Sequence, residues 1–577
     1  MMADVDTQCQ FRGMIGILAP FSSKPAVRDE RPGVHRARRS TKVTPATSWP
    51  SGSLEEGSAR VGRRPSGGLL DAHLYSSPKS RRFGCSRPEF YVRSLGDLKI
   101  RIEPLGGDAK GSETWHQATR IQADDNGAMA MDRSPSYQEP ARELPVIGTP
   151  DVLVVGAGSA GVAAAVAAAR RGADTLLIEA SGCLGGLATV GLINLLLTLD
   201  DGASTQVVAG LCQEVVDRLD VSGNARYPPR GTWGSEASEV VASWRPWGLI
   251  WGAPPEAVRY SVAFDPEAFV DICYDLLEEA GAQLRLHTWF AAAPVSGSSI
   301  DAVIVESKRG REAIRPRVVI DATGDGDVLV SAGARFEQVS IPPHLWFRVG
   351  GVADDAMAAA PDGGLGLLWF RTTAPGRVLV PFGPHPERVD ACDPDDLTRA
   401  EVACRRAARA HFNVLRSQMK GFEGAWLDDY ARMLGITESR RLVGDYVLRK
   451  EDGDVRFADA VAQTGHWTRR NVVYDIPYRC LTTSLVDNLL VAGRCISATR
   501  YVHQATKEIP AAMASGEAAG AAAAAAAARA TTGSAAAGGA PSNIRTIDVA
   551  ALRRDLSAQG AIVGPGIRTE ASRRSAR

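Results

Sequence analysis

The sequence predicts an α/β protein in which buried parallel strands alternate with helices. The continuous apolar run at residues 151–155 is typical of a strand that is buried on both faces. A stretch rich in small residues follows at 159–173 and predicts a helix, and a second apolar run at 175–178 predicts another buried strand. Strand, helix and strand within about thirty residues form one βαβ unit of the Rossmann type.

Length and charge limit the number of domains and the kinds of partner. The 577 residues suffice for two or three domains, and the chain carries 66 basic and 66 acidic residues. Because these charges balance, we expect neither nucleic acid nor an anionic membrane surface as a partner. The expected partner is a small-molecule substrate, and the sequence does not predict an oligomeric state.

The nine cysteines are dispersed, with no C-x-x-C pair and no zinc or iron–sulfur spacing. We therefore expect no metal site, and reduced thiols in a cytoplasmic protein. The alanine run at 518–530 includes Arg529 and follows Glu517, so it predicts a closely packed helix rather than a membrane span.

Residues 1–142 differ in composition from the rest of the chain. They are rich in Arg, Ser, Pro and Gly and lack apolar periodicity, which is typical of disorder. Two interpretations stay open: a flexible extension, or an upstream reading of the gene with the working start at Met129 or Met131. In either case we expect residues before about Glu143 to be dispensable.

The turn between the first strand and the first helix carries a dinucleotide-binding pattern. Gly156, Gly158 and Gly161 form G-x-G-x-x-G, and Glu179 ends the second strand. The first glycine permits a tight turn, the second lets a pyrophosphate approach the main chain, and the third permits close helix–strand packing. The acid is placed to accept hydrogen bonds from ribose hydroxyls, which predicts a dinucleotide site. The alternative is a merely structural glycine turn.

Two later segments favour a flavin dinucleotide over a nicotinamide one. Gly185 and Gly186 follow the acid closely and suit an extended cofactor that lies across the loop. Ala322-Thr323-Gly324-Asp325 ends another buried strand, where small residues permit close approach of the cofactor.

Residues 145–525, about two-thirds of the chain, resemble a known family. The stretches that carry the resemblance are DVLVVGAGSAGVAAAVAAARRGA, LGGLATVG, FDPE, LLEEAGAQL, VIDATGDGDV, LGITESRRLVGDYVL, YDIPYRCL and NLLVAGRCISAT. They are similar to the FAD-dependent oxidoreductases related to the flavoprotein subunit of heterodisulfide reductase and, more distantly, to fumarate reductase and glutathione reductase flavoproteins. The resemblance implies FAD held by a Rossmann-type domain that is split in sequence, with an inserted mixed α+β domain that covers the flavin.

The predicted organisation follows from this resemblance. We expect the FAD-binding domain at 143–200, 262–340 and 471–530, the inserted substrate or cap domain at 201–261 and 341–470, and a linker with a short helix at 531–577. The residues expected to contact FAD are Gly156, Gly158, Ser159, Gly161, Glu179, Gly185, Gly186, Thr323, Gly324, Asp325, Gly493 and Arg494.

The segment after CISAT departs from the family pattern. Arg500 stands where the family usually has His, and Lys507 stands where it usually has Arg, with His503 between them. This change predicts a substrate that differs from those of related proteins. The cysteines needed for an iron–sulfur cluster are also missing.

Three side chains are candidates for catalysis beside the flavin. We expect His503 to donate or accept a proton, Lys507 to hold an anion, and Arg440 to fix a substrate carboxylate or the electron-rich flavin edge. The alternatives are a structural role for the first two, and an ion pair of Arg440 with Glu438 or Asp445.

Other reactive or aromatic residues have simpler interpretations. Cys480 and Cys495 are expected to be small buried thiols rather than a redox pair. The tryptophans between 233 and 251 either pack a domain or line a substrate entrance. The predicted function is FAD-dependent oxidation or reduction of an unidentified small organic substrate. The alternatives are an electron-transfer subunit or a non-catalytic flavoprotein.

Overall fold

The computed structural model describes residues 137–252, 254–358, 368–385, 387–531 and 542–564. The expectations for residues 1–136, including the choice between Met129 and Met131 as a start, lie outside the described residues. All elements discussed below belong to one unit that includes residues 140–577.

A five-stranded parallel sheet forms the centre of this unit. Its strand order is β22 (Leu489–Val491), β13 (Val318–Asp321), β2 (Val152–Val155), β3 (Thr175–Ile178) and β7 (Gln283–Arg285). The predicted strands at 151–155 and 175–178 are therefore confirmed as neighbours. Because all five strands run the same way, their carboxyl ends lie at one edge of the sheet, the usual place for ligands in such folds.

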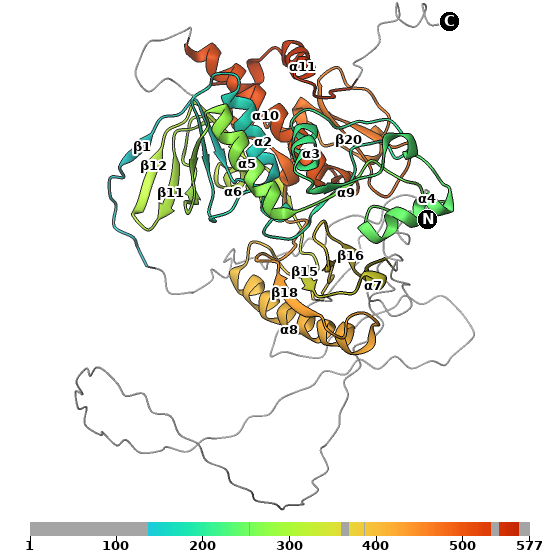
Figure 1. Cartoon of the computed structure of the whole chain (residues 1–577). Coiled ribbons are helices and arrows are strands. Elements are labelled where there is room, and N and C mark those ends of the chain that lie inside the picture. Colours follow the sequence, from blue (N-terminus) through green and yellow to red (C-terminus); the bar gives the residue numbers. More distant parts are fainter. Residues whose placement is uncertain (1–136, 253, 359–367, 386, 532–541, 565–577) are drawn as a thin grey trace, which may run out of the picture. The chain divides into compact units, whose positions relative to one another are not determined.

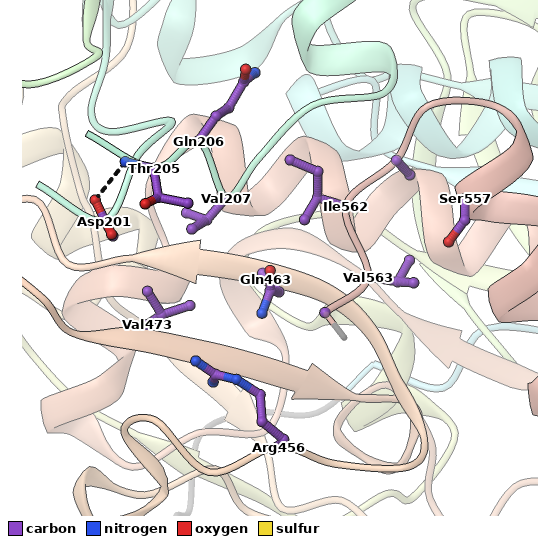
Figure 2. A pocket seen from close by; sticks show the side chains of 12 residues that line it. Asp201, Thr205, Gln206, Val207, Arg456, Gln463, Val473, Ser557, Ile562 and Val563 are labelled. Carbon is purple, nitrogen blue, oxygen red and sulfur yellow. Dashed lines mark hydrogen bonds between the residues drawn. The ribbon is translucent and has the colours of Figure 1, made fainter. Parts of the chain in front are cut away.

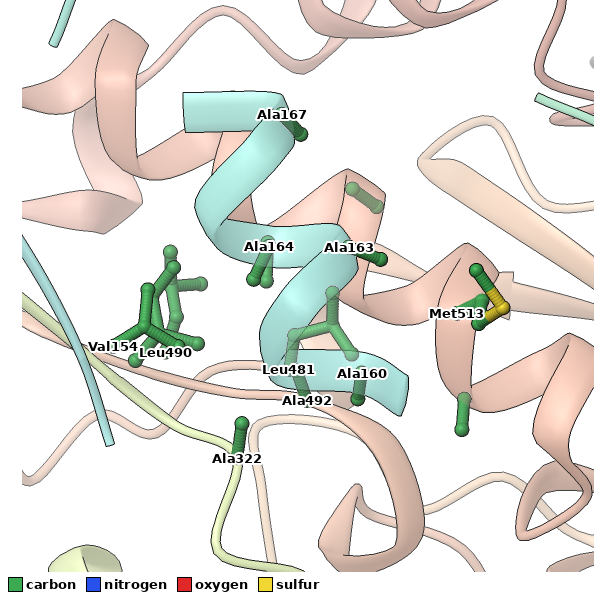
Figure 3. Close-up of a cluster of buried hydrophobic side chains, with 14 of the residues drawn as sticks. Val154, Ala160, Ala163, Ala164, Ala167, Ala322, Leu481, Leu490, Ala492 and Met513 are labelled. Atoms are coloured by element: carbon green, nitrogen blue, oxygen red, sulfur yellow. The ribbon is translucent and has the colours of Figure 1, made fainter. Parts of the chain in front are cut away.

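Helix α2 (Ser159–Ala169) and helix α10 (Ile509–Thr531) pack directly against each other (Figure 1). A Cβ at Gly516 would lie 2.1 Å from the carbonyl oxygen of Ala160, and one at Gly520 would lie 2.1 Å from that of Ala164. The two backbones thus approach as closely as glycine permits. Figure 3 shows the small side chains of α2, with Met513 nearby. The alanine run is a buried helix, as predicted.

A second hydrophobic core packs against a separate, antiparallel sheet of four strands. The strand order is β16 (Phe370–Arg371), β17 (Arg377–Val380), β15 (Phe347–Gly350) and β18 (Trp426–Tyr430). Helix α8 (Pro394–Gln418) packs its apolar positions into this core, among them Cys404, Ala408 and Phe412. Asp393 caps α8 by accepting hydrogen bonds from two backbone amides. The sequence predicts this helix at 396–419, within two residues of its bounds.

The remaining strands form smaller sheets. One has the order β1 (Val146–Gly148), β12 (Gly310–Ile314), β11 (Val303–Ser307) and β8 (Trp289–Ala292). A three-stranded sheet has the order β4 (Leu195–Leu196), β6 (Val262–Phe264) and β5 (Ala225–Arg226). The two-stranded pairs are β9 (Val295–Ser296) with β10 (Ser299–Ile300), β14 (Phe336–Gln338) with β19 (Arg440–Leu442), and β20 (Ala460–Gly465) with β21 (Val473–Pro477).

The other helices are α3 (Leu211–Val221), α4 (Ser238–Trp244), α5 (Pro266–Ala280), α6 (Asp327–Ser331), α7 (Asp354–Ala358), α9 (Arg500–Thr506) and α11 (Val549–Ala558). Helix α5 begins after Asp265, whose carboxylate accepts from two backbone amides, and ends at Gly281. Within the described ranges, each helix is too short or too polar to cross a membrane.

Candidate functional site

The glycine turn between β2 and α2 has the geometry of a phosphate-binding loop. Gly156 has a φ of +96°, and its Cβ would lie 2.7 Å from the carbonyl oxygen of Ala322. A Cβ at Gly161 would lie 1.8 Å from the carbonyl oxygen of Gly156, so a side chain is excluded there. Gly158 differs, because its Cβ would meet no described atom within 4 Å. The turn therefore packs closely against neighbouring backbone at Gly156 and Gly161 and leaves space beside Gly158.

The open side of this turn faces the beginning of a helix. Gly158 is the N-cap of α2, and no side chain in the described part of the chain caps the helix. The first backbone N–H groups of α2 thus stay available to an anion, and the helix dipole favours negative charge at this end. This arrangement fits a pyrophosphate group at Gly158.

The second glycine pair lies directly on the first turn. The backbone N–H of Gly185 donates to Ala157 O at 2.9 Å, and the Ser159 hydroxyl donates to Gly185 O at 3.1 Å. Gly186 has a φ of +59°, and its Cβ would lie 3.0 Å from the Cα of Gly158. The two turns that the sequence singles out are thus brought together.

Glu179 follows β3 and ties these turns to each other. Its Oε2 accepts a hydrogen bond from the N–H of Ala157 at 2.8 Å, and its Oε1 accepts one from the N–H of Ser181 at 2.8 Å. A carboxylate oxygen has more than one lone pair, so the group retains acceptor capacity for ribose hydroxyls. Its position at the carboxyl end of a central strand is the one expected of a ribose-binding acid.

The turn after β13 is organised by the buried carboxylate of Asp321. Its Oδ1 accepts from the Thr323 hydroxyl at 2.7 Å and from the Thr323 N–H at 3.1 Å, and its Oδ2 accepts from Leu329 N–H at 2.8 Å. Burial raises the pKa of Asp321, while these hydrogen bonds oppose the shift. Gly324 follows with a φ of +79°. The network fixes the shape of the turn that carries Thr323 and Gly324.

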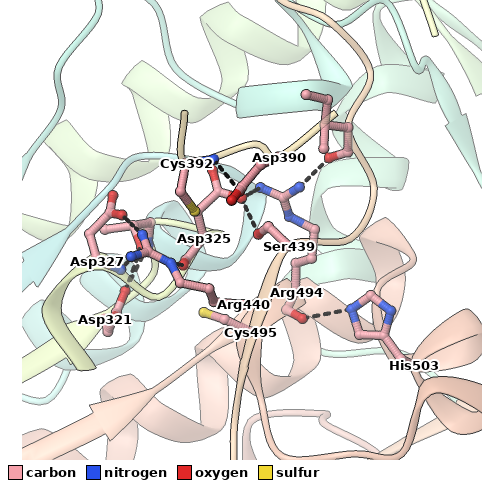
Figure 4. Close-up of polar contacts among 12 residues, drawn as sticks. Asp321, Asp325, Asp327, Asp390, Cys392, Ser439, Arg440, Arg494, Cys495 and His503 are labelled. Carbon is pink, nitrogen blue, oxygen red and sulfur yellow. Dashed lines mark hydrogen bonds and ion pairs between the residues drawn. The ribbon is translucent and has the colours of Figure 1, made fainter. Parts of the chain in front are cut away.

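Arg494, after β22, joins its own turn to the turn after β13 (Figure 4). Its guanidinium donates to Asp325 Oδ1 at 2.8 Å and to the carbonyl oxygen of Ile436. Gly493 has a φ of +77°, and its Cβ would lie 2.7 Å from the Cβ of Ala160 on α2. All four predicted glycine turns therefore meet at the carboxyl edge of the central sheet.

Arg440 lies in the same polar network (Figure 4). Its Nε donates to the carbonyl oxygen of Asp325 at 2.7 Å, and its guanidinium pairs with the carboxylate of Asp327. Burial and the nearby carboxylates of Asp321 and Asp325 raise the pKa of Asp327 to about 6. Arg440 thus forms an ion pair, as the alternative interpretation expected, but its partner is Asp327 and neither Glu438 nor Asp445.

The two acids named for that alternative bond elsewhere. Glu438 accepts from Arg500 at 3.0 Å and from Gln504 at 2.6 Å. Asp445 accepts from the hydroxyl of Thr482 at 2.7 Å. The partner of Arg440 was not predictable from the sequence, because Asp327 lies 113 positions away from it.

His503, on α9, is completely buried beneath the Arg494 turn. Its Nε2 lies 2.9 Å from the carbonyl oxygen of Arg494, which can only accept, so Nε2 carries the proton and donates. Nδ1 has no hydrogen-bond partner among the residues that the structure describes. Burial, together with the positive charge of Lys507, lowers the pKa of His503 well below its ordinary value. The imidazole is therefore neutral at neutral pH.

Lys507 ends α9 and lies just before α10. Its ammonium donates to the hydroxyl of Thr437 at 3.3 Å, and the side chain is partly exposed. Two further histidines lie within the range of its charge: His344 and His466. Burial first, and Lys507 among the nearby charges, lower their pKa values to about 4 and about 3. No sequence motif marks these two histidines, and only the folded chain brings them near Lys507.

A surface pocket of about 500 Å³ lies elsewhere (Figure 2). It is lined by Asp201, Thr205, Gln206, Val207, Arg456, Gln463, Val473, Ser557, Ala561, Ile562, Val563 and Gly564. None of these residues belongs to the four glycine turns. The turns, with their phosphate-binding geometry, are therefore the stronger candidate for the dinucleotide site.

Cys480 and Cys495 are fully buried, and burial raises the pKa of each thiol. Such thiols are poor nucleophiles, as expected from the sequence. Among the tryptophans, Trp233 stacks on Tyr260 with ring centroids 4.3 Å apart, which is a packing role.

Comparison with known proteins identifies the family. Residues 151–537 match the family described as FAD dependent oxidoreductase. No curated protein matches the chain. Solved structures with similarity include a geranylgeranyl bacteriochlorophyll reductase-like protein from Thermoplasma acidophilum (14% identity, TM-score 0.37, 65% of this chain and 78% of that chain). Another is p-nitrophenol 4-monooxygenase from Pseudomonas putida DLL-E4, with 14% identity, a TM-score of 0.35, and coverage of 66% of this chain and 78% of that chain. A third is L-amino acid deaminase from Proteus vulgaris, with 13% identity, a TM-score of 0.39, and coverage of 66% of this chain and 94% of that chain.

At such TM-scores the similarity does not extend to a substrate. The family match covers the four glycine turns, the central sheet and the α2–α10 pair. The chain is a member of the FAD dependent oxidoreductase family, an enzyme of mixed α/β fold with FAD as its cofactor.

Proposed function

We propose that this enzyme binds FAD across the four glycine turns and oxidises or reduces a small organic substrate beside the flavin. The observation that carries the proposal is the meeting of these turns at the carboxyl ends of β2, β3, β13 and β22. When bound, FAD supplies hydride or electron transfer, and the protein positions the substrate and manages protons. No comparison supports the alternative of an electron-transfer subunit.

Each turn has a proposed part in holding the cofactor. Gly158 and the first amides of α2 would hold the pyrophosphate, and Glu179 the adenosine ribose. The turn at Thr323–Gly324 and the turn at Gly493–Arg494 would line the remaining length of FAD. Two observations support these assignments. A Cβ at Gly156, Gly161 or Gly186 would lie 3.0 Å or less from a neighbouring backbone atom, so the turns pack closely against one another. A Cβ at Gly158 would meet no described atom within 4 Å, so space is left there for the pyrophosphate.

The domain organisation predicted above stays part of the proposal. Strands from 143–200, 262–340 and 471–530 supply the central sheet, which supports an FAD-binding domain that is split in sequence. The separate core of β15–β18 and α8 supports the 341–470 part of the substrate domain proposed at 201–261 and 341–470. The closer relationship to the flavoprotein subunit of heterodisulfide reductase rests on the sequence stretches alone.

We assign the candidate catalytic residues different parts. Lys507 is the proposed catalytic residue, since the residue is partly exposed and its ammonium hydrogen-bonds only a neutral hydroxyl in the described part of the chain. It would stabilise negative charge on the reduced flavin or on the substrate. His503 is a positioning residue that supports the Arg494 turn through its Nε2–H. Arg440 would position the turn at Asp325 in the same way.

The test is the reduction potential of the bound flavin in the Lys507→Met variant. Loss of the positive charge should lower the potential by at least about 30 mV, equivalent to about 1.4 kcal/mol for a two-electron couple, while FAD stays bound. Lys420→Met is the matched control, because the Lys420 side chain is 89% exposed and pairs with Asp355. An unchanged potential in Lys507→Met would remove the catalytic assignment.

A further inference from the structure

The surface pocket of about 500 Å³ is separate from the four glycine turns (Figure 2). Its walls come from the segment 201–207, from the β20–β21 hairpin with the loop before it, and from the chain at and after the end of α11. Pockets that bind small molecules have volumes of about 300–1,000 Å³. This pocket is therefore large enough for a ligand of its own.

Aliphatic side chains form part of the pocket wall. They are Val207, Val473, Ile562 and Val563. The segment that carries the last two is held in place, because the guanidinium of Arg553 donates to the carbonyl oxygen of Val563 at 3.1 Å. A fixed aliphatic wall favours a ligand with an apolar part.

Arg456 provides a cation at this pocket. Its Nη1 donates to the carbonyl oxygen of Val455 at 3.3 Å and lies 3.4 Å from Asp475 Oδ1. Its Nε and Nη2 form no hydrogen bond with the described residues, and the side chain is 32% exposed. Free N–H groups on adjacent nitrogens of a guanidinium match the two oxygens of a carboxylate.

The carboxylates near Arg456 accept hydrogen bonds from other donors. Asp475 is fully buried and accepts from the amide nitrogen of Gln463 at 2.6 Å and from a backbone N–H at 3.1 Å. Asp454 accepts from the backbone N–H of Val473 at 3.4 Å and forms no ion pair with Arg456 in the described part of the chain. The guanidinium of Arg456 thus keeps the capacity to bind a ligand carboxylate.

Gln463, on β20, is a buried polar side chain with one unused acceptor. The residue is 5% exposed, and its amide nitrogen donates to Asp475. Its Oε1 accepts no hydrogen bond from the residues that the structure describes. A buried acceptor without a donor is unfavourable, so this position in the pocket wall favours a ligand with an N–H group.

Asp201 provides an anion at the same pocket. Its Oδ1 accepts from three consecutive backbone N–H groups, those of residues 203–205, at 2.8–3.0 Å. Figure 2 shows the last of these hydrogen bonds, to Thr205. The Oδ2 of Asp201 accepts no hydrogen bond within the described ranges. The backbone thus fixes the carboxylate and leaves one oxygen for a ligand.

The cations near Asp201 do not neutralise it. Arg259 donates to two backbone carbonyl oxygens, each at 3.0 Å, and Arg470 pairs with Glu236. Among the described residues, Asp201 forms no ion pair with either of them or with Arg456. Opposite charges therefore line one pocket without pairing with each other.

We infer that this pocket binds an α-amino acid with an aliphatic side chain, such as leucine. Arg456 binds the carboxylate, Asp201 and the Oε1 of Gln463 accept hydrogen bonds from the ammonium, and the aliphatic wall contacts the side chain. A ligand with both charges compensates both residues, whereas a carboxylate or an amine alone leaves one of them without a partner. The inference goes beyond the proposed function, because none of these residues belongs to the glycine turns.

The experiment is calorimetric titration of the purified protein, with its FAD, with leucine at pH 7. Three compounds each lack one feature of leucine: 4-methylpentanoate lacks the ammonium, 3-methylbutylamine lacks the carboxylate, and glycine lacks the side chain. We expect leucine to bind at least about tenfold more tightly than each of them.

Variants assign the two charged contacts. Arg456→Gln should weaken leucine at least about tenfold and leave 3-methylbutylamine unchanged, whereas Arg456→Lys should retain part of the affinity. Asp201→Asn should weaken leucine by a similar factor and leave 4-methylpentanoate unchanged, since the Oδ1 of Asn can still accept from the backbone. The controls are Arg315→Gln and Asp301→Asn, which alter a half-exposed ion pair elsewhere and should bind leucine like wild type.

Each outcome decides for or against the inference. A protein that binds no leucine, or binds 4-methylpentanoate or 3-methylbutylamine as tightly as leucine, overturns it. Leucine that reduces the flavin and binds equally well to Arg456→Gln and Asp201→Asn lies at the flavin site and also overturns it. If Arg456→Gln does not fold, the tenfold loss in Asp201→Asn and the partial loss in Arg456→Lys decide in its favour. A wild-type protein that binds leucine but no FAD would contradict the proposed function alone.

Discussion

The guanidinium of Arg494 donates to the carboxylate of Asp325 at 2.8 Å and so joins the turn after β22 to the turn after β13. On the other side, the imidazole of His503 donates to the backbone carbonyl of Arg494. Gly324 has a φ of +79°, and a Cβ there would lie 2.8 Å from Arg494 Nη2, so a side chain at this position would displace the guanidinium. This pair therefore holds together two of the turns proposed to bind FAD.

Asp325→Asn should weaken FAD binding by about tenfold or more. A hydrogen bond that involves charged groups contributes about 1.5–3 kcal/mol, and its weakening loosens the direct link between the two turns. The measurement is a titration of the apoprotein with FAD, followed by quenching of flavin fluorescence.

The matched control is Asp301→Asn, because Asp301 pairs with Arg315 and both side chains are about half exposed. Equal FAD affinities for Asp325→Asn and wild type would show that the Asp325–Arg494 pair does not support the site.

Gly520→Ala should destabilise the protein by up to about 2 kcal/mol, which is an overpacking cost of about 3 kcal/mol less a gain in helix propensity of about 1 kcal/mol. The new Cβ would lie 2.1 Å from the carbonyl oxygen of Ala164, and overpacking of this kind costs about 1–3 kcal/mol or more. The better helix propensity of alanine returns about 1 kcal/mol, which is too little to reverse the sign.

Urea unfolding checks this prediction, with Gly424→Ala as the control, since a Cβ at Gly424 would meet no described atom within 4 Å. A Gly520→Ala protein as stable as wild type would mean that α2 and α10 separate without cost.

Glu517→Gln should stabilise the protein above pH 7 and have little effect near pH 4.5. Glu517 is 3% exposed and accepts from the Leu211 N–H at the start of α3, and burial raises its pKa from 4.5 to about 7. The folded state thus binds the proton more tightly than the unfolded state. Wild-type stability therefore falls as the pH rises from 4.5 to 7, by up to about 3 kcal/mol at about 1.4 kcal/mol per pH unit.

Urea unfolding of both proteins between pH 4.5 and 8 measures the difference. Glu279→Gln is the control: Arg218 lowers the pKa of the Glu279 carboxyl below 4.5, so this variant should be less stable than wild type by a nearly constant amount across this pH range. A stability difference that does not change with pH would show that Glu517 is ionised in the folded protein throughout this range.

The local elements of the fold were predictable because their signals are contiguous in sequence. The first βαβ unit follows from two apolar runs around a small-residue helix, and α8 follows from its amphipathic spacing over about 396–419. The placement of β13 between β2 and β22 was not predictable from propensity, because it depends on pairing of strands more than 150 positions apart.

In the candidate site, too, features that are local in sequence were predictable and pairings between distant segments were not. The glycine turns carry their own signature, since a positive φ or a close backbone approach admits only glycine at Gly156 and Gly161. The partners of Arg494 and Lys507 carry none, because Asp325 and Thr437 lie 169 and 70 positions away. The sequence also gave no sign that His503 donates to a backbone carbonyl rather than to a ligand.

The central claim is that FAD lies against the open face of Gly158. The most direct measurement is the FAD content and affinity of wild type and of Gly158→Ala. The added methyl meets no described atom within 4 Å and Gly158 has a φ of −65°, so the variant should fold and melt like wild type. It should nevertheless bind FAD at least about tenfold more weakly, because the methyl occupies the space of the pyrophosphate. A folded wild-type protein that takes up no FAD, or a Gly158→Ala variant with unchanged FAD affinity, would contradict the account.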